Sequence, residues 1–117
     1  MGRKNVVKSF KMLDAVDISS SQTSDATNVI NLDTASIHVV WSAGSSPVGT
    51  ITVEARNGEN DSWYELDFGS TISVSGASGD HQIMLNEMPF TDIRILYTAT
   101  SGSATLTATL TMKTMGA

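Results

Sequence analysis

The residues that could carry out catalysis are few and scattered. The chain has 117 residues, with two histidines and no cysteine. The lack of cysteine excludes thiol nucleophiles, disulfides and thiolate-bound metals. His38 lies within a run of alternating apolar residues and His81 follows a glycine-containing loop, and neither has a serine and an acid in a recognisable triad arrangement. We therefore expect both histidines to be surface or hydrogen-bonded structural residues, with no catalytic residue and no enzymatic activity.

Other side chains suited to chemistry also lack the required pattern. The segment around Ser78 does not match the nucleophile elbow of hydrolases. Glu65 and Asp67 stand two residues apart in an alternating run, which a solvated strand face explains without acid–base catalysis. The oxygen-rich loop Asn57–Asp61 lacks the spacing of a calcium loop, and its Asn-Gly pair predicts a hairpin turn. We expect no metal site and no cofactor.

Three aromatic residues are candidates for ligand or protein contacts. Trp41 alternates with apolar residues of a predicted strand, so we expect it in the core. Trp63 and Tyr64 are adjacent and must point to opposite faces of an extended segment, so only one can face inward. The other is predicted to contact a sugar or a partner protein.

Charge is divided unevenly between the start of the chain and the rest. The net charge is −5, yet no acid precedes Asp14 and the remainder carries most of the acids. An acidic body does not favour nucleic-acid binding. The basic start also carries apolar residues, so we expect residues 1–13 to contact a neighbouring copy. The candidate interface residues are Arg3, Lys4, Lys8, Phe10, Lys11, Met12 and Leu13.

The fold class follows from composition and alternation. Serine and threonine make up about a quarter of the chain, and valine and isoleucine outnumber leucine. Apolar residues alternate with polar ones in several runs, which is typical of half-buried strands. The sequence predicts an all-β protein, an antiparallel β-sandwich or jelly roll of about 8–9 strands with an extended N-terminal arm. The predicted core includes Trp41, Ile51, Val53, Ile93, Ile95, Leu106 and Leu110.

The chain divides into three predicted parts. Residues 1–18 form the arm, residues 19–26 a polar linker and residues 27–117 the sandwich domain. Tight turns are expected at 44–47 and 101–103, between pairs of successive strands. No apolar run approaches the roughly 20 residues that span a bilayer, so we expect no membrane partner. A compact chain of this length has a radius of gyration of about 13 Å.

Two stretches resemble a known group of proteins. One runs Ser46-Pro47-Val48-Gly49-Thr50-Ile51-Thr52-Val53-Glu54-Ala55, then an Asn57-Gly58 turn and Trp63-Tyr64-Glu65-Leu66. The other runs Phe90-Thr91-Asp92-Ile93-Arg94-Ile95-Leu96-Tyr97-Thr98 and continues through Ser101-Gly102-Ser103 to Ala108. Together they resemble small β-sandwich structural proteins of tailed bacteriophages, over roughly the last 75 residues.

This resemblance implies a non-enzymatic virion structural protein, made in the cytoplasm of a bacterial host. Its first implication is a capsid decoration (cement) protein that binds the major capsid protein and other copies of itself, as an oligomer in the assembled particle. Head-fibre, tail and neck proteins belong to the same group. A carbohydrate-binding or host-adhesion module remains the alternative from a different class, and Trp63 or Tyr64 would carry it.

Overall fold

The computed structural model describes residues 5–29, 34–85 and 90–115, and within these ranges every regular element is a β-strand. The strands are β1 (Asn5–Asp17), β2 (Gln22–Thr23), β3 (Thr27–Asn28), β4 (Thr34–Arg56), β5 (Tyr64–Glu65), β6 (Ile72–Ser75), β7 (Gly79–Leu85) and β8 (Asp92–Met115). All recorded strand pairs are antiparallel. The prediction of an all-β antiparallel fold is confirmed.

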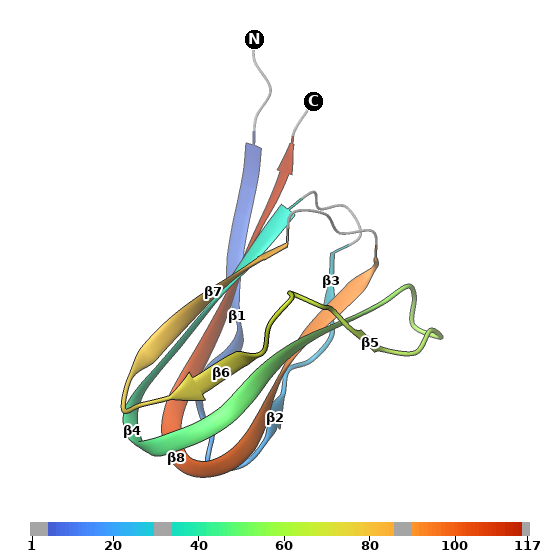
Figure 1. The fold of residues 1–117 in the computed structure, drawn as a ribbon. Helices are drawn as coiled ribbons and strands as arrows, with labels where there is room; N and C mark the ends of the chain where they lie inside the picture. Colours follow the sequence, from blue (N-terminus) through green and yellow to red (C-terminus); the bar gives the residue numbers. More distant parts are fainter. Residues whose placement is uncertain (1–4, 30–33, 86–89, 116–117) are drawn as a thin grey trace.

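Two long strands build both layers of the sandwich. β4 and β8 pair along almost their whole length, from Thr34 with Lys113 to Arg56 with Asp92, and both bend near the middle (Figure 1). The first layer holds β1, the second half of β8, the first half of β4 and β7. The second layer holds β2 and β3, the first half of β8, the second half of β4, and β5 and β6.

The bend lies at the residues where tight turns were predicted. That prediction is wrong in that the two strands continue through these residues instead of reversing. Residues 44–47 and 101–103 do carry turn-like conformations, with positive φ at Ser46 and Gly102. The register of β4 against β8 shifts there but continues on both sides, so each strand changes layer without reversing. A side chain on Gly102 would collide with the backbone of Ser45 and Ser46, which is why glycine stands at this corner.

The core lies between the two layers and confirms the alternation analysis. The strand pairs place Trp41 opposite Leu106, and Val53 opposite Ile95, on the inward faces. The indole Nε1 of Trp41 donates a hydrogen bond to the carbonyl of Gly76 at 3.2 Å. All the predicted core residues are buried: Trp41, Ile51, Val53, Ile93, Ile95, Leu106 and Leu110.

The segment expected as an arm is an edge strand. β1 pairs with the second half of β8, and Leu13 and Ile18 are buried in the core of the same chain. Residues 5–11 pair with residues 109–115 without a register shift, and we call these paired segments the terminal ribbon. Residues 109–113 also pair with β4 on their other side, so only the end of the ribbon, residues 5–6 and 114–115, extends beyond the other strands (Figure 1). The projection therefore exists, but it contains both ends of the described chain. The radius of gyration is 15.0 Å, because the molecule is longer than a compact globule of its size.

The segment expected as a polar linker follows the edge of the second layer. Gln22 and Thr23 pair with Tyr97 and Leu96 of β8. Ser24 is buried, and its backbone N–H donates to the carbonyl of Ile95 at 2.9 Å while its hydroxyl accepts from the Ile95 N–H at 2.9 Å. The Ser21 hydroxyl likewise accepts from the Ala99 N–H at 3.0 Å, so these two serines satisfy backbone groups at the edge of β8.

Tyr97 places a polar hydroxyl group inside the apolar core. Its side chain is 1% exposed, it packs over Gly49, and among the described residues its hydroxyl has no hydrogen-bond partner. Burial raises the pKa of this hydroxyl above its ordinary value. The folded state therefore holds this proton more tightly than the unfolded state does. The free energy of unfolding keeps its full value below the unfolded pKa of about 10, and it falls as pH rises from there through the folded pKa.

Tyr97→Phe is therefore expected to leave the free energy of unfolding unchanged, or to raise it by about 1 kcal/mol, at neutral pH. The variant should also lose less stability than the parent chain above about pH 10. Urea unfolding at both pH values measures this, with exposed Tyr64→Phe as the control. A clear loss of stability at neutral pH would show that the hydroxyl has a partner.

Candidate interaction surfaces

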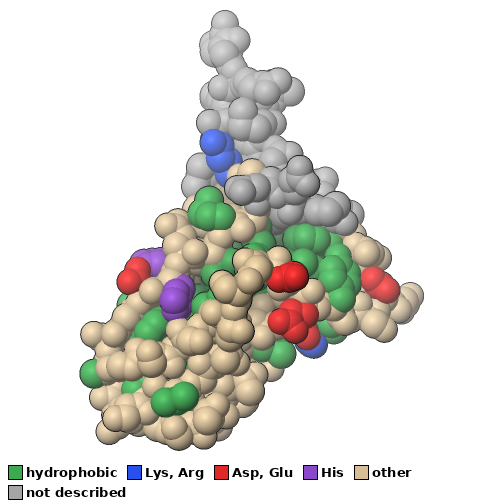
Figure 2. Space-filling view, in the orientation of Figure 1, with side chains coloured by type: hydrophobic (Ala, Val, Ile, Leu, Met, Phe, Trp, Pro, Cys, Tyr) green, Lys and Arg blue, Asp and Glu red, His purple; other side chains and the backbone are tan. Residues whose placement is uncertain are grey.

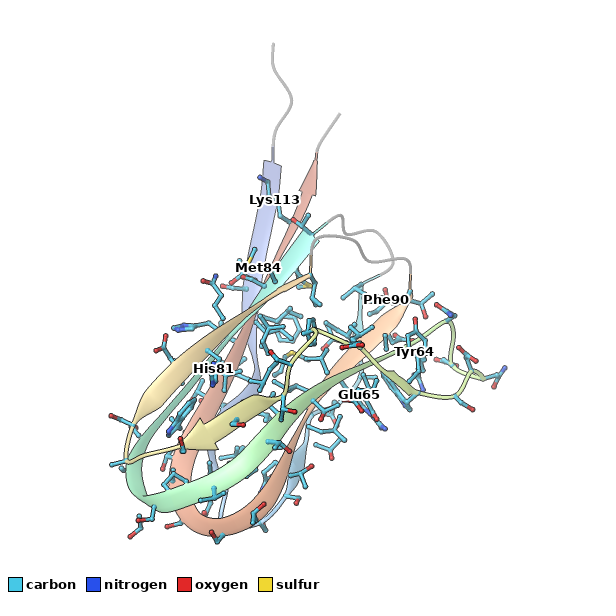
Figure 3. The ribbon with its side chains drawn as sticks, in the orientation of Figure 1. Tyr64, Glu65, His81, Met84, Phe90 and Lys113 are labelled. Atoms are coloured by element: carbon cyan, nitrogen blue, oxygen red, sulfur yellow. The ribbon has the colours of Figure 1, made fainter. Side chains whose placement is uncertain are left out.

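The predicted interface residues of the first segment separate into exposed and buried sets. Phe10 is 40% exposed, and exposed Lys11 lies 3.4 Å from Asp14. Met12 packs partly against the core, and Leu13 belongs to it. Arg3 and Lys4 lie outside the described residues, as does the side chain of Lys8, whose backbone pairs with Met112. The exposed set lies on the terminal ribbon, with Lys113 on its β8 side (Figure 3).

Trp63 is held by cations of its own chain. The guanidinium carbons of Arg56 and Arg94 lie 4.6 and 4.3 Å from the centroid of the indole ring. Each arginine is also ion-paired, Arg56 with Asp92 at 3.1 Å and Arg94 with Glu54 at 2.6 Å. Trp63 is half-buried in this arrangement, whereas Tyr64 is 39% exposed. Of the two adjacent aromatics, Tyr64 is the one available to a partner.

The charges around Trp63 balance one another. Glu54 faces Arg94, and Arg56 faces Asp92, in two pairs between β4 and β8 that are separated by the pair Ala55–Ile93. Their side chains are between 11% and 27% exposed, so solvent screens these pairs less than surface ones. Two cations and two anions leave no net charge, and the cluster holds the loop between β4 and β5 against the sheet. The cluster therefore has a structural role, and its charges are used within the chain.

A groove runs along the open edge of the sandwich. β5 pairs with β4 up to Glu54–Glu65, the Leu66 N–H still donates to the Val53 carbonyl at 2.9 Å, and β6 joins β4 at the pair Ile51–Ile72. Residues 67–71 between them bulge away from the sheet. A hollow of about 610 Å³ lies between this bulge and residues 50–52. A second hollow of about 210 Å³ shares Phe68 and Ile72 with it and reaches β7. We refer to the two hollows, lined by residues 50–52, 65–72 and 81–84, as the edge groove.

The edge groove is acidic at one end and apolar at the other. Glu65 and Asp67 line the larger hollow, and both are exposed. Phe68 is 37% exposed and Met84 is 53% exposed in the smaller hollow. Acidic and apolar side chains gather side by side on the face seen in Figure 2, and Figure 3 shows Glu65 and Met84 on different layers.

A histidine fixes the two strands that border the groove. The Nε2 atom of His81 in β7 lies 2.7 Å from the carbonyl oxygen of Ser73 in β6, to which it donates. Its ring centroid lies 5.5 Å from that of Trp41. His38 Nε2 lies 2.9 Å from Asp80 Oδ2 on the outer face of the first layer. Both histidines are hydrogen-bonded, as expected.

Sequence reasoning did not predict the edge groove. It arises because β5 and β6 are short and separated, whereas alternation predicted a longer strand through Leu66 and Phe68. Among residues 5–29, 34–85 and 90–115, no group of three or more histidine, aspartate or glutamate side chains could hold a metal ion. No helix in the described part of the chain is long and apolar enough to cross a membrane.

Comparison with solved structures identifies similar folds. A protein derived from the SPBc2 prophage, YomS, is 16% identical, with a TM-score of 0.61 over 92% of this chain and 95% of that one. A chain of infectious bursal disease virus, Gx strain, is 13% identical, with a TM-score of 0.62 over 97% of this chain and 33% of the viral one. The VP2 subviral particle of infectious bursal disease virus gives 14% identity and a TM-score of 0.57 over 97% and 33%.

The present chain spans about a third of the length of these viral chains and almost all of the prophage protein. At such low identity the similarity shows the fold. No protein-family model and no curated protein matches the sequence.

Proposed function

We propose that the protein is a non-enzymatic structural component of a virus particle, and specifically a decoration protein on the capsid of a tailed phage. The observation that supports this most is the similarity to YomS over nearly the full length of both chains. The same two-layer fold occurs in chains of infectious bursal disease virus particles. The strand and turn motifs resemble phage structural proteins of decoration, head-fibre, tail and neck types alike, and the capsid surface is the assignment that we propose among them.

The mechanism would be repeated weak contact. Each sandwich binds the major capsid protein, and its terminal ribbon contacts a neighbouring copy. A single such contact is weak, because exposed ion pairs contribute about 0–1 kcal/mol each. Many copies on one shell raise the effective concentration of each contact, so the layer binds more tightly than one molecule does.

Labelling of purified phage particles tests this assignment. An antibody against the chain should decorate the heads of intact virions, and purified protein should sediment with shells from which it has been stripped. Labelling of tails or necks would support that assignment instead. The absence of the chain from virions would contradict a structural role.

The carbohydrate-binding alternative has less support. The Trp63 ring lies against Arg56 and Arg94, which leaves Tyr64 as the exposed aromatic of the pair. A sugar platform commonly needs a free aromatic face, because the ring stacks on the apolar side of the sugar. Glycan binding by the monomer that Tyr64→Ala abolishes would favour this alternative over a decoration protein.

Deleting residues 2–11 is expected to weaken binding to stripped shells by about tenfold or more, because the deletion removes the exposed ribbon residues Phe10 and Lys11. The sandwich should remain folded, since the deletion stops before Met12 and Leu13, which pack in or against the core. Co-sedimentation measures binding, and thermal unfolding checks the fold. Equal binding by the shortened and full-length chains would remove the ribbon from the mechanism.

A further inference from the structure

We propose that the edge groove is the receptor for the terminal ribbon of a second copy of this chain. The inference rests on the proposed function in that it names the site by which neighbours on a shell join. It concerns two opposite edges of the molecule: the ribbon lies on the β1 edge of the first layer, and the groove lies along the edge formed by β5, β6 and β7 (Figure 1). The contact would be head-to-tail, so assemblies larger than a dimer can form.

Charge favours this pairing over other pairings of the same surfaces. The ribbon segment of β1 includes Lys8 and Lys11 and no acid, and the basic Arg3 and Lys4 precede it in sequence. Lys11 lies 3.4 Å from Asp14, but both side chains are more than half exposed, so this pair is weak. The residues that line the groove include the acids Glu65 and Asp67 and contain no lysine or arginine. The nearby Arg56 and Arg94 are each ion-paired. Two ribbons would repel each other, and two grooves would as well.

Exposed apolar side chains occur on both surfaces. Phe10 is 40% exposed on the ribbon although its register partner Leu110 is fully buried. Phe68 and Met84 are exposed in the smaller hollow, where Ile72 and Ile83 also line the wall. An aromatic ring against a methionine sulfur and a second ring is a favourable contact. Burial of Phe10 in this hollow would supply affinity, and the charges would supply orientation.

The ribbon cannot reach the groove of its own chain. Residues 5–11 are paired in regular register with residues 109–115, and β8 and β4 separate them from β7 and the groove (Figure 1). Folding back would break this pairing. The segment that occupies the groove must therefore come from another molecule.

Mixing two defective variants tests the proposal. The ribbon variant carries Phe10→Ser and Lys11→Glu, and the groove variant carries Phe68→Ser and Met84→Ser. All four residues are at least one-third exposed, so both variants should fold, which thermal unfolding verifies. Val40→Ser is the matched control, because Val40 is also 40% exposed but lies on the outer face of the first layer, in neither surface.

Sedimentation velocity on the full-length chain should show concentration-dependent oligomers, and the Val40→Ser control should match it. Each defective variant alone should associate about tenfold or more weakly. The mixture should form a one-to-one heterodimer and nothing larger, because only one intact ribbon and one intact groove are present. High salt should weaken association of the full-length chain.

Three results would overturn the inference: a full-length chain that stays monomeric at every accessible concentration, a groove variant that associates normally, or a mixture that forms no heterodimer. The proposed function is tested separately by particle binding. A chain that decorates heads yet stays monomeric refutes the groove but not the function. A chain that associates through ribbon and groove yet is absent from virions refutes the function but not the groove.

Discussion

Trp41→Ala is expected to lower the free energy of unfolding by about 3–5 kcal/mol, the usual cost of removing a large aromatic side chain from a core. Trp41 is 4% exposed, and its indole donates to the Gly76 carbonyl and lies beside His81. The substitution leaves a cavity between the layers and an unpaired carbonyl at the turn before β7. A loss of this size is a large part of the about 5–15 kcal/mol that stabilises a small domain.

Urea unfolding followed by circular dichroism measures the effect without relying on tryptophan fluorescence. Trp63→Ala is the control, because it removes the same side chain from a half-buried position against two arginines. Its expected cost is about 1 kcal/mol, mainly lost cation–π contact. Equal costs for the two variants would show that Trp41 does not hold the two layers together.

Gly102→Ala is expected to cost about 2–5 kcal/mol, through a strained backbone and a steric clash. Gly102 has φ of +74°, and a Cβ atom there would collide with the Ser46 carbonyl of the paired strand. The clash is with backbone at the corner where β4 and β8 both change layer. Relief would require the two strands to separate at the bend.

Gly69→Ala separates the two causes. Gly69 has φ of +83°, close to that of Gly102, but no atom lies within 4 Å of the position its Cβ would take. This control should cost about 1–2 kcal/mol, the penalty for an L-residue in the left-handed region. The same denaturation measurement applies to both. If the two variants were equally stable, the corner would have room for a side chain.

Sequence alternation predicted the strands of the core, because every second residue of a strand with one inward face is apolar. It did not predict that β4 and β8 are continuous, since Gly102 and Ser46 adopt the same positive φ in a bend as in a reversing turn. It also did not predict that β1 pairs with β8. Register shifts between Lys11 and Leu13, and between Leu13 and Val16, change the phase of alternation along β1.

The interaction surfaces were only partly predictable from sequence. Phe10 and Lys11 are exposed on the terminal ribbon, whereas Leu13 is in the core, because the register shift turns its side chain inward. The charge pattern predicted that the basic first segment contacts a partner, but it did not predict which surface of the partner binds that segment. The edge groove arises where residues 67–71 leave β4, and the alternation of the local sequence does not predict that departure.

The pairing of β8 has a consequence for how the chain acquires its structure. β1, β2, β3 and β4 all pair with this one strand, which follows all the other described strands in the sequence. Asn5 pairs with Met115, so β1 cannot complete its pairing until residue 115 has been synthesised. Pairings between such distant segments form slowly, on the order of milliseconds to seconds. Most of the sheet can therefore close only after β8 has emerged from the ribosome, and until then the other strands leave their edges open to other chains.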